Sequence, residues 1–266
     1  MSFSINGKTA IITGAANGIG LEIARRFADR GANVMCADID EKKLEEEWGN
    51  LSEDGNLRYF AGDLRQRLTI ANLVSATIDN FDRVDILVNA SRQVIETNAL
   101  DVEDTSVSVL LEQNLMTALH LTQQVAKRMI KQGAEQPEGQ LGSIINLSSI
   151  TARSTLPELM GYSIASAALE QMTKSMALVL APERIRVNAI AFGSVMSASL
   201  QSAMLENSEW RDDILDHTPL GRIAGPSELS ETVQFLAAES SAFMTGEILT
   251  VDGGRSLLDA VSIPAH

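Results

Sequence analysis

Short apolar runs alternate with segments of helical periodicity along nearly the whole chain. The first run, Lys8 to Thr13, has the continuous apolar character of a strand buried on both faces, and Ile19, Ile23 and Phe27 follow it at the spacing of one helix face. Further runs predict strands at Asn33 to Ala37, Leu57 to Ala61, Asp85 to Ala90, Ser143 to Leu147, Ile185 to Ala191 and Glu247 to Val251. Because parallel strands need crossover helices, this alternation predicts an α/β fold, a doubly wound parallel sheet of about seven strands with helices on both faces.

Helices are expected between these strands. The expected ranges are Glu41 to Trp48 with Asp40 as its N-cap, Gln66 to Asn80, Asp104 to Lys131 and Pro157 to Leu180. The segment from Ser194 to Arg222 sets apolar side chains among acids, which is typical of an amphipathic helix that could cover a substrate. Ordinary core packing explains the same pattern equally well.

Length and composition limit the classes of function. The 266 residues suit one α/β domain, and an apolar content of 45% is enough for a large core. No segment has the apolar length of a signal core or a membrane span, and Cys36 lies in an apolar run as a buried structural thiol would, so we expect a cytoplasmic protein without membrane contact. A formal net charge of -14 argues against nucleic acid and leaves small molecules or proteins as partners. The three histidines lack acidic companions at ligand spacing, so no metal site is indicated.

A glycine-rich turn separates the first strand from the first helix. It runs from Thr13 to Gly20, T-G-A-A-N-G-I-G, with glycines spaced G-x-x-x-G-x-G. Glycine lets the backbone turn sharply and approach a pyrophosphate, whose charge the amides at the N-terminus of the next helix would meet. Turns also use glycine for conformational reasons alone. The strand before it, the helix after it and the acid that follows the second strand make nucleotide binding the stronger interpretation.

That acid, Asp38, indicates which dinucleotide is bound. A carboxylate at this position can accept hydrogen bonds from both hydroxyls of the adenosine ribose, whereas it would repel a 2′-phosphate. The positions that could have supplied a compensating cation hold Asn17 and Ala37. NAD is therefore preferred over NADP. A helix cap is the alternative role for Asp38, but Asp40 is better placed for capping.

More motifs follow in order along the chain. They are G-D-L (62–64), D-I-L-V-N-A (85–90), Q-N-L (113–115), I-N-L-S-S (145–149), Tyr162, I-R-V-N-A-I (185–190) and T-G-E-I-L-T-V-D-G-G (245–254). With the glycine-rich turn, they resemble the classical short-chain dehydrogenase/reductase (SDR) family over nearly the whole chain. The resemblance implies a Rossmann-like fold, a nicotinamide cofactor, a small-molecule substrate and a homodimer or homotetramer. It implies a single SDR domain over residues 1–266, with residues 1–150 mainly binding the dinucleotide and residues 151–266 supplying the catalytic helix, the substrate lid and the last strand.

The resemblance also implies roles for individual residues. Ser149 would polarise the substrate carbonyl or alcohol, Tyr162 would exchange the proton, and Asn114 would support a water relay; a plain hydrogen bond to a neighbouring helix is the alternative for Asn114. The implied cofactor-binding residues are Gly14, Asn17, Gly18, Ile19, Gly20, Asp38, Asp63, Leu64, Asn89, Val195 and Ser197. Of these, Asp63 and Leu64 would contact the adenine, and Val195 and Ser197 the carboxamide.

The match to the family breaks at Ser166. The family has a lysine there, which lowers the pKa of the tyrosine and grips the nicotinamide ribose. Positions 162 and 166 share a helix face, so the neighbour relation persists without its charge. A tyrosine hydroxyl ordinarily has a pKa near 10, so a base that works near neutrality needs about two to three units of depression. Arg92 and Arg153, each in a loop after a strand, are candidates for the missing cation, and solvated surface charges are the alternative.

Two other departures lie in the same region. Arg92 stands where the family has the last glycine of its N-N-A-G motif, and Phe192 stands where it has the proline of a Pro-Gly pair. Two functions therefore stay open. The first is an NAD(H)-dependent oxidoreductase that interconverts a secondary alcohol and a ketone. The alternative is a catalytically silent NAD-binding protein that acts as a redox-responsive or structural partner.

Overall fold

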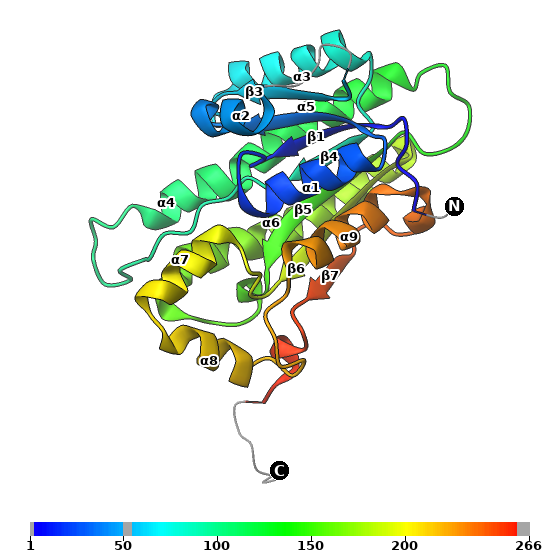
Figure 1. The fold of residues 1–266 in the computed structure, drawn as a ribbon. Coiled ribbons are helices and arrows are strands. Elements are labelled where there is room, and N and C mark those ends of the chain that lie inside the picture. Colours follow the sequence, from blue (N-terminus) through cyan, green and yellow to red (C-terminus); the bar gives the residue numbers. More distant parts are fainter. Residues whose placement is uncertain (1–2, 50–54, 260–266) are drawn as a thin grey trace.

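The computed structural model of the protein describes residues 3–49 and 55–259. Within these residues a seven-stranded sheet, parallel throughout, has the order β3-β2-β1-β4-β5-β6-β7 (Figure 1). The strands are β1 (Thr9–Thr13), β2 (Asn33–Asp38), β3 (Leu57–Ala61), β4 (Ile86–Asn89), β5 (Gly142–Ser149), β6 (Ile185–Phe192) and β7 (Ile248–Val251). The order reverses beside β1, as in dinucleotide-binding folds. The predicted doubly wound parallel sheet is confirmed.

Helices cover both faces of the sheet. On one face, α1 (Gly18–Asp29), α2 (Glu41–Trp48) and α9 (Pro226–Ala237) contribute to a single apolar cluster. On the other face, α3 (Arg67–Phe81), α5 (Thr117–Gln132) and α6 (Met160–Leu180) contribute to a second. Three more helices, α4 (Ser106–Leu111), α7 (Ala198–Glu206) and α8 (Glu209–Asp216), extend from the end of the sheet where the strands finish (Figure 1).

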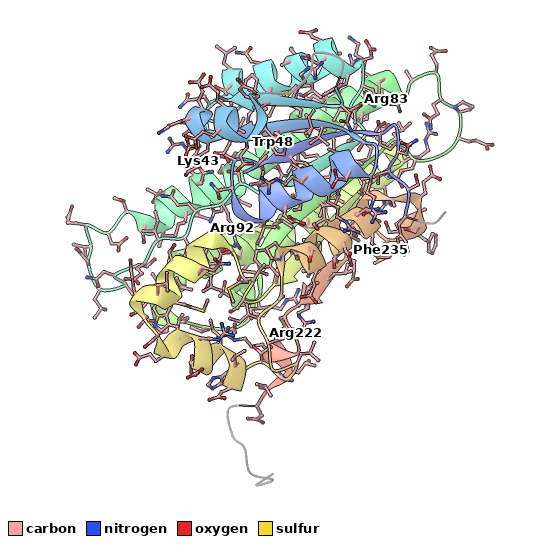
Figure 2. All side chains as sticks on the ribbon, viewed as in Figure 1. Lys43, Trp48, Arg83, Arg92, Arg222 and Phe235 are labelled. Carbon is pink, nitrogen blue, oxygen red and sulfur yellow. The ribbon has the colours of Figure 1, made fainter. Side chains whose placement is uncertain are left out.

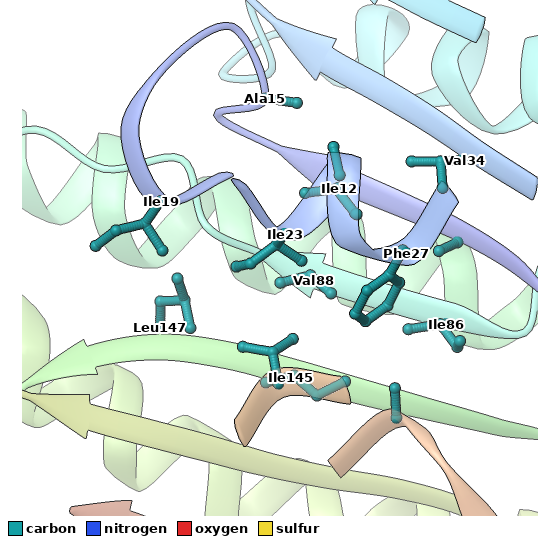
Figure 3. Packing of buried hydrophobic residues seen from close by; sticks show 14 of the residues in the cluster. Ile12, Ala15, Ile19, Ile23, Phe27, Val34, Ile86, Val88, Ile145 and Leu147 are labelled. Atoms are coloured by element: carbon teal, nitrogen blue, oxygen red, sulfur yellow. The ribbon is translucent and has the colours of Figure 1, made fainter. Parts of the chain in front are cut away.

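Consecutive strand residues contribute to the apolar clusters on opposite faces of the sheet, because successive side chains of a strand point to opposite faces. Ile12 packs with Ile23 and Phe27 of α1, as Figure 3 shows, whereas its neighbour Ile11 belongs to the cluster on the α3 and α5 face. Both faces are buried, which is why the strands read as continuous apolar runs. Cys36 is fully buried in β2, and burial raises the pKa of its thiol, as expected of a structural cysteine.

The structure corrects two helix predictions. The helix expected from Asp104 to Lys131 is interrupted by a π-helical segment, Glu112–Met116, between α4 and α5. The carbonyl of Glu112 accepts from the backbone N–H of Thr117, the spacing of a π-helix, and also from the hydroxyl of Thr117 at 3.0 Å. The single lid helix expected between Ser194 and Arg222 is wrong, since the segment forms two helices, α7 and α8.

One more α-helix lies between α8 and β7. Helix α9 follows α8 and begins with Pro226, while the side chain of Glu228 accepts from the backbone N–H of Gly225 at 2.9 Å. Sequence periodicity did not single out this helix. Among the described residues, no helix is both long and apolar enough to span a membrane.

Candidate active site

The side chains singled out in the sequence gather at one edge of the sheet. The glycine-rich turn follows β1, and Asp38, Asn89, Ser149 and Phe192 are the last residues of β2, β4, β5 and β6. All these strands are parallel, so their carboxyl ends lie on the same side, where doubly wound sheets bind ligands. The parallel sheet therefore brings residues that are scattered along the sequence together in one candidate site.

Two glycines of the glycine-rich turn, Gly14 and Gly20, leave no room for a Cβ. Gly14 has a φ of 68°, and a Cβ there would lie 2.9 Å from the Cα of Ser91 in the loop after β4. A Cβ on Gly20 would lie 2.1 Å from the carbonyl oxygen of Gly14. Gly18 has a φ of 55°, and the exposed Asn17 makes no side-chain capping bond to α1. The first amides of α1 are thus left uncapped by a side chain, which fits a bound pyrophosphate.

Asp38 is tied to that turn. One carboxylate oxygen accepts from the backbone N–H of Ala16 at 3.1 Å, and the other accepts from the N–H of Asp40 at 3.1 Å. The side chain of Asp40 caps α2 by accepting from the N–H of Lys43. The capping role belongs to Asp40, and the Asp38 carboxylate is half-buried beside the turn, where it fits the ribose of a dinucleotide.

The other predicted adenosine residues follow β3. Asp63 binds Arg65 through both carboxylate oxygens, at 2.7 Å for the closest pair, and this guanidinium holds the pKa of Asp63 below its usual range. The side chain of Leu64 is buried in the core, as is that of Ile19 at the start of α1. Contact between Leu64 and an adenine would therefore come from its backbone.

A buried polar ladder crosses the sheet beneath the site. The amide nitrogen of Asn89 donates to Asn146 on β5 at 2.8 Å and to Thr122 on α5 at 3.2 Å, and the amide of Asn146 donates to Thr173 on α6 at 2.8 Å. Asn89 and Asn146 are paired residues of adjacent strands. Such buried hydrogen bonds between side chains hold the strands and helices in one arrangement. Sequence reasoning missed Asn146, although it lies in a motif beside the predicted Ser149.

Tyr162, Ser149 and Ser166 are all buried, with at most 6% of each residue exposed. The hydroxyl of Ser166 donates to the backbone carbonyl of Tyr162 at 2.8 Å, so it is used on its own helix and not on the phenol. Ser149 accepts from the N–H and the hydroxyl of Thr151 at 3.2 and 3.0 Å. Because both bonds use Ser149 as acceptor, its own proton can be donated to a substrate oxygen.

A cation reaches the phenol from another part of the chain. Arg92, labelled in Figure 2, donates from Nη1 to the hydroxyl of Tyr162 at 2.9 Å. Its guanidinium carbon lies 4.3 Å from the ring centre of Phe192. The other candidate, Arg153, pairs with Glu170 at 3.2 Å and donates to Thr250. Of the two arginines, Arg92 is therefore the one that contacts the tyrosine.

Asn114 lies in the π-helical segment and grips the loop that carries Arg92. Its Oδ1 accepts from the backbone N–H of Gln93 at 2.8 Å, and its Nδ2 donates to the carbonyl of the same residue at 2.8 Å. The side chain therefore bonds to a loop and not to a neighbouring helix. Nothing in the sequence pattern marks Gln93, because the contact is made by its backbone.

A small cavity lies under the tyrosine. Its volume is about 10 Å³, about what one water position needs. It is lined by Asn89, Ser91, Arg92, Asn114, Ala118, Leu147, Tyr162, Ser166 and Leu169. Ser166 and Tyr162 thus open into the same polar space as the predicted Asn89 and Asn114.

The two residues predicted to hold a carboxamide follow β6. Val195 is buried and forms an isolated parallel bridge with Ala224, and the N–H of Met196 donates to the carbonyl of Ala224 at 2.8 Å. The hydroxyl of Ser197 accepts from the N–H of Leu200 in the first turn of α7. The segment that leads into α7 is therefore fixed to the segment before α9. Among the described residues, no group of three or more His, Cys, Asp or Glu side chains could hold a metal ion.

Comparison with known proteins agrees with this geometry. The family model described as enoyl-(acyl carrier protein) reductase matches residues 14–256. The 3-oxoacyl-(acyl-carrier-protein) reductase FabG of Thermotoga maritima is 31% identical over 255 residues, covering 94% of this chain and 98% of the relative. The 7alpha-hydroxysteroid dehydrogenase of Escherichia coli K12 is 31% identical over 251 residues, covering 94% of each chain.

Solved structures agree as well. A 7 alpha-hydroxysteroid dehydrogenase complexed with NADH and 7-oxo glycochenodeoxycholic acid superposes with a TM-score of 0.86 at 30% identity, over 95% of this chain and 96% of that one. The structure of gox2181 gives a TM-score of 0.88 at 29% identity, over 96% and 98% of the two chains. The chain belongs to the classical short-chain dehydrogenase/reductase family of oxidoreductases.

Proposed function

We propose that this protein is an NAD(H)-dependent oxidoreductase that interconverts a secondary alcohol and a ketone. The observation that carries the proposal is the buried hydroxyl of Tyr162 at the carboxyl edge of the sheet, in a cavity shared with Asn114 and Asn89. A titratable hydroxyl in a polar cavity beside a dinucleotide-type turn is what proton exchange coupled to hydride transfer requires.

The proposed cofactor is NAD. The uncapped first turn of α1, the glycine positions that exclude a Cβ and the carboxylate of Asp38 beside Ala16 support this choice. When bound, the nicotinamide would donate or accept the hydride. Isothermal titration should show tighter binding of NADH than of NADPH, and equal affinities would contradict the assignment.

The chain's own residues would handle the proton. In the reductive direction, Tyr162 gives the proton of its hydroxyl to the carbonyl oxygen of the substrate, while Ser149 donates a hydrogen bond to that oxygen and polarises it. In the oxidative direction, Tyr162 takes the proton from the alcohol. Asn114 holds the loop after β4 through its two bonds to Gln93, which supports the site whether or not it also orders a water.

The activity is tested with a panel of alcohols and ketones under NAD(H). Because the names of two relatives refer to a 3-oxoacyl-(acyl-carrier-protein) and to a 7alpha-hydroxysteroid, the panel includes 3-oxoacyl compounds and hydroxysteroids. We expect turnover that a Tyr162→Phe variant lacks. If native protein and variant have the same rate on every compound while NADH still raises the melting temperature, the silent NAD-binding alternative holds instead.

We also propose that residues 1–266 act as one domain in a cytoplasmic homodimer or homotetramer. Leu178 and Val179 are 78% and 64% exposed on α6, and Phe243 is fully exposed before β7. Apolar side chains of this size on a surface favour contact with a second copy. Light scattering measured after size-exclusion chromatography gives the oligomer mass, and a purely monomeric mass would contradict this proposal.

A further inference from the structure

We infer that Arg92, whose guanidinium packs on the ring of Phe192, is the cation that stabilises the phenolate of Tyr162 in this chain, in place of the family's lysine. The inference rests on the proposed function, because it names the group that supports proton exchange by Tyr162. It also gives one explanation for all three departures from the family. Ser166 no longer provides a charge, Arg92 provides one from the loop after β4, and Phe192 holds it in place.

The contact puts a full charge on the reacting atom. Nη1 of Arg92 donates to the hydroxyl oxygen of Tyr162 at 2.9 Å. A guanidinium stays protonated at any working pH, and a charged donor binds a phenolate more strongly than a neutral phenol. When Tyr162 releases its proton to a substrate oxygen, the negative charge left on the phenolate is therefore met by Arg92, which keeps its own protons.

Phe192 is the seat for this guanidinium. It is 3% exposed and belongs to the apolar cluster that also contains Ile19, Leu147 and Val195, so its ring is fixed by packing. The guanidinium carbon lies 4.3 Å from the ring centre, a distance at which the aromatic face attracts a cation. A proline at this position would offer no such face. Phe192 is thus a positioning residue for Arg92.

The backbone on both sides of Arg92 is held. The hydroxyl of Thr13 accepts from the N–H groups of Ala90 and Ser91 at 3.0 and 2.9 Å. On the other side, Asn114 bonds to both backbone groups of Gln93. The backbone that carries the Arg92 side chain is therefore held in place, as a preorganised electrostatic group requires.

Among the described residues, no ion pair competes for the charge of Arg92. None of the ion pairs between described side chains includes Arg92. Arg153 differs, because Glu170 neutralises it at 3.2 Å. The hydroxyl of Ser166 is bonded to the backbone of its own helix. Arg92 is the group left to stabilise the phenolate.

The test measures the ionisation of Tyr162 directly and needs no substrate. The chain contains two tyrosines, so a Tyr59→Phe background leaves Tyr162 as the one phenol that titrates in the ultraviolet difference spectrum. In this background, Arg92→Gln keeps a hydrogen-bond donor and removes the charge. We expect the pH midpoint for ionisation to rise by about 1–3 units, the usual effect of an adjacent opposite charge.

Two variants make the result specific to the charge and its seat. Arg92→Lys should restore a midpoint lower than that of Arg92→Gln, and Phe192→Leu should raise the midpoint by a smaller amount than Arg92→Gln does. Arg153→Gln is the matched control and should leave the midpoint of the background unchanged. Circular dichroism checks that each variant is folded.

Each outcome decides the inference. The inference would be overturned if Arg92→Gln had the same midpoint as the background. It would also be overturned if Arg153→Gln shifted the midpoint as much as Arg92→Gln does. If Arg92→Gln does not fold, Phe192→Leu decides instead, and a midpoint equal to that of the background would overturn the inference. Should the midpoint shift as expected while no compound in the panel is turned over, the proposed function fails and the role of Arg92 as the partner of Tyr162 stands.

Discussion

The strongest test of the coupling between positions 92 and 166 is a double-mutant cycle. Ser166→Lys returns the family's cation to α6, and Arg92→Gly returns the family's glycine to the loop after β4. Residue 166 is 5% exposed and opens into the cavity that Tyr162 and Arg92 also line. A lysine there would extend from the same helix face toward the phenol of Tyr162, which already binds the guanidinium of Arg92 at 2.9 Å.

The magnitude follows from two positive charges sharing one phenol. At a separation of about 5 Å, their repulsion is about 1 kcal/mol in a water-like dielectric and about 3 kcal/mol in the environment typical of a protein surface. Arg92 is exposed, so we expect the lower part of this range, about 1–2 kcal/mol. The flexibility that glycine adds to the unfolded chain is the same in both backgrounds and cancels in the cycle.

The assay is urea unfolding of the native protein, both single variants and the double variant. Ser166→Lys should lose more stability in the presence of Arg92 than in its absence, and the difference is the coupling free energy. The coupling should shrink as pH rises, because burial beside a cation lowers the pKa of a lysine and it then loses its charge. Coupling below about 0.5 kcal/mol, the usual limit of additivity, would refute the shared-phenol geometry. So would a sign that makes Arg92 stabilise the new lysine.

Three other predictions concern the rest of the molecule. Asp38→Asn should move the ratio of NADH to NADPH affinity toward NADPH by about tenfold, because the repulsion of the 2′-phosphate is relieved; isothermal titration measures it. Gly20→Ala should lower the free energy of unfolding by about 1–3 kcal/mol and weaken NADH binding, since its Cβ would lie 2.1 Å from the carbonyl oxygen of Gly14. The pKa of Glu228 is lowered to about 2, first by its bond to Arg222, so its contribution to stability is present above its ordinary value of 4.5 and is lost as pH falls toward 2. That contribution is small because the Glu228 side chain is 41% exposed, and Glu228→Gln should remove it from the acid limb of a thermal-melting profile.

Each of these predictions has a matched control. Asp40→Asn neutralises the neighbouring acid, which caps α2, and should leave the affinity ratio unchanged, so an equal change in both variants would contradict the role given to Asp38. Gly225→Ala places its Cβ 3.6 Å from the nearest atom and should be nearly neutral; a loss as large as that of Gly20→Ala would show that crowding is not the cause. Glu231→Gln alters an acid that is 62% exposed, and an acid limb that shifts equally with it would argue against a specific contribution from Glu228.

The sequence by itself determined the features that depend on short segments. Continuous apolar runs predicted the buried strands and hence the parallel sheet, since a strand covered on both faces needs apolar side chains on both. The glycine-rich turn and the acid after β2 were also readable, because each depends on the backbone geometry of a few residues and on the regular packing of a β-α-β unit. The capping role of Asp40 was predicted on the same local grounds.

Only the tertiary structure decided which charge serves the tyrosine. Arg92 and Tyr162 are 70 residues apart, and their contact depends on where the loop after β4 and the start of α6 lie once the sheet is formed. The same holds for the seat on Phe192, which comes from β6. Asn114 of the π-helical segment bonds to the backbone of Gln93 in a distant loop, a contact that no local pattern encodes. Local propensity therefore accounts for the frame of this protein, whereas side-chain contacts between distant elements decide the chemistry of its site.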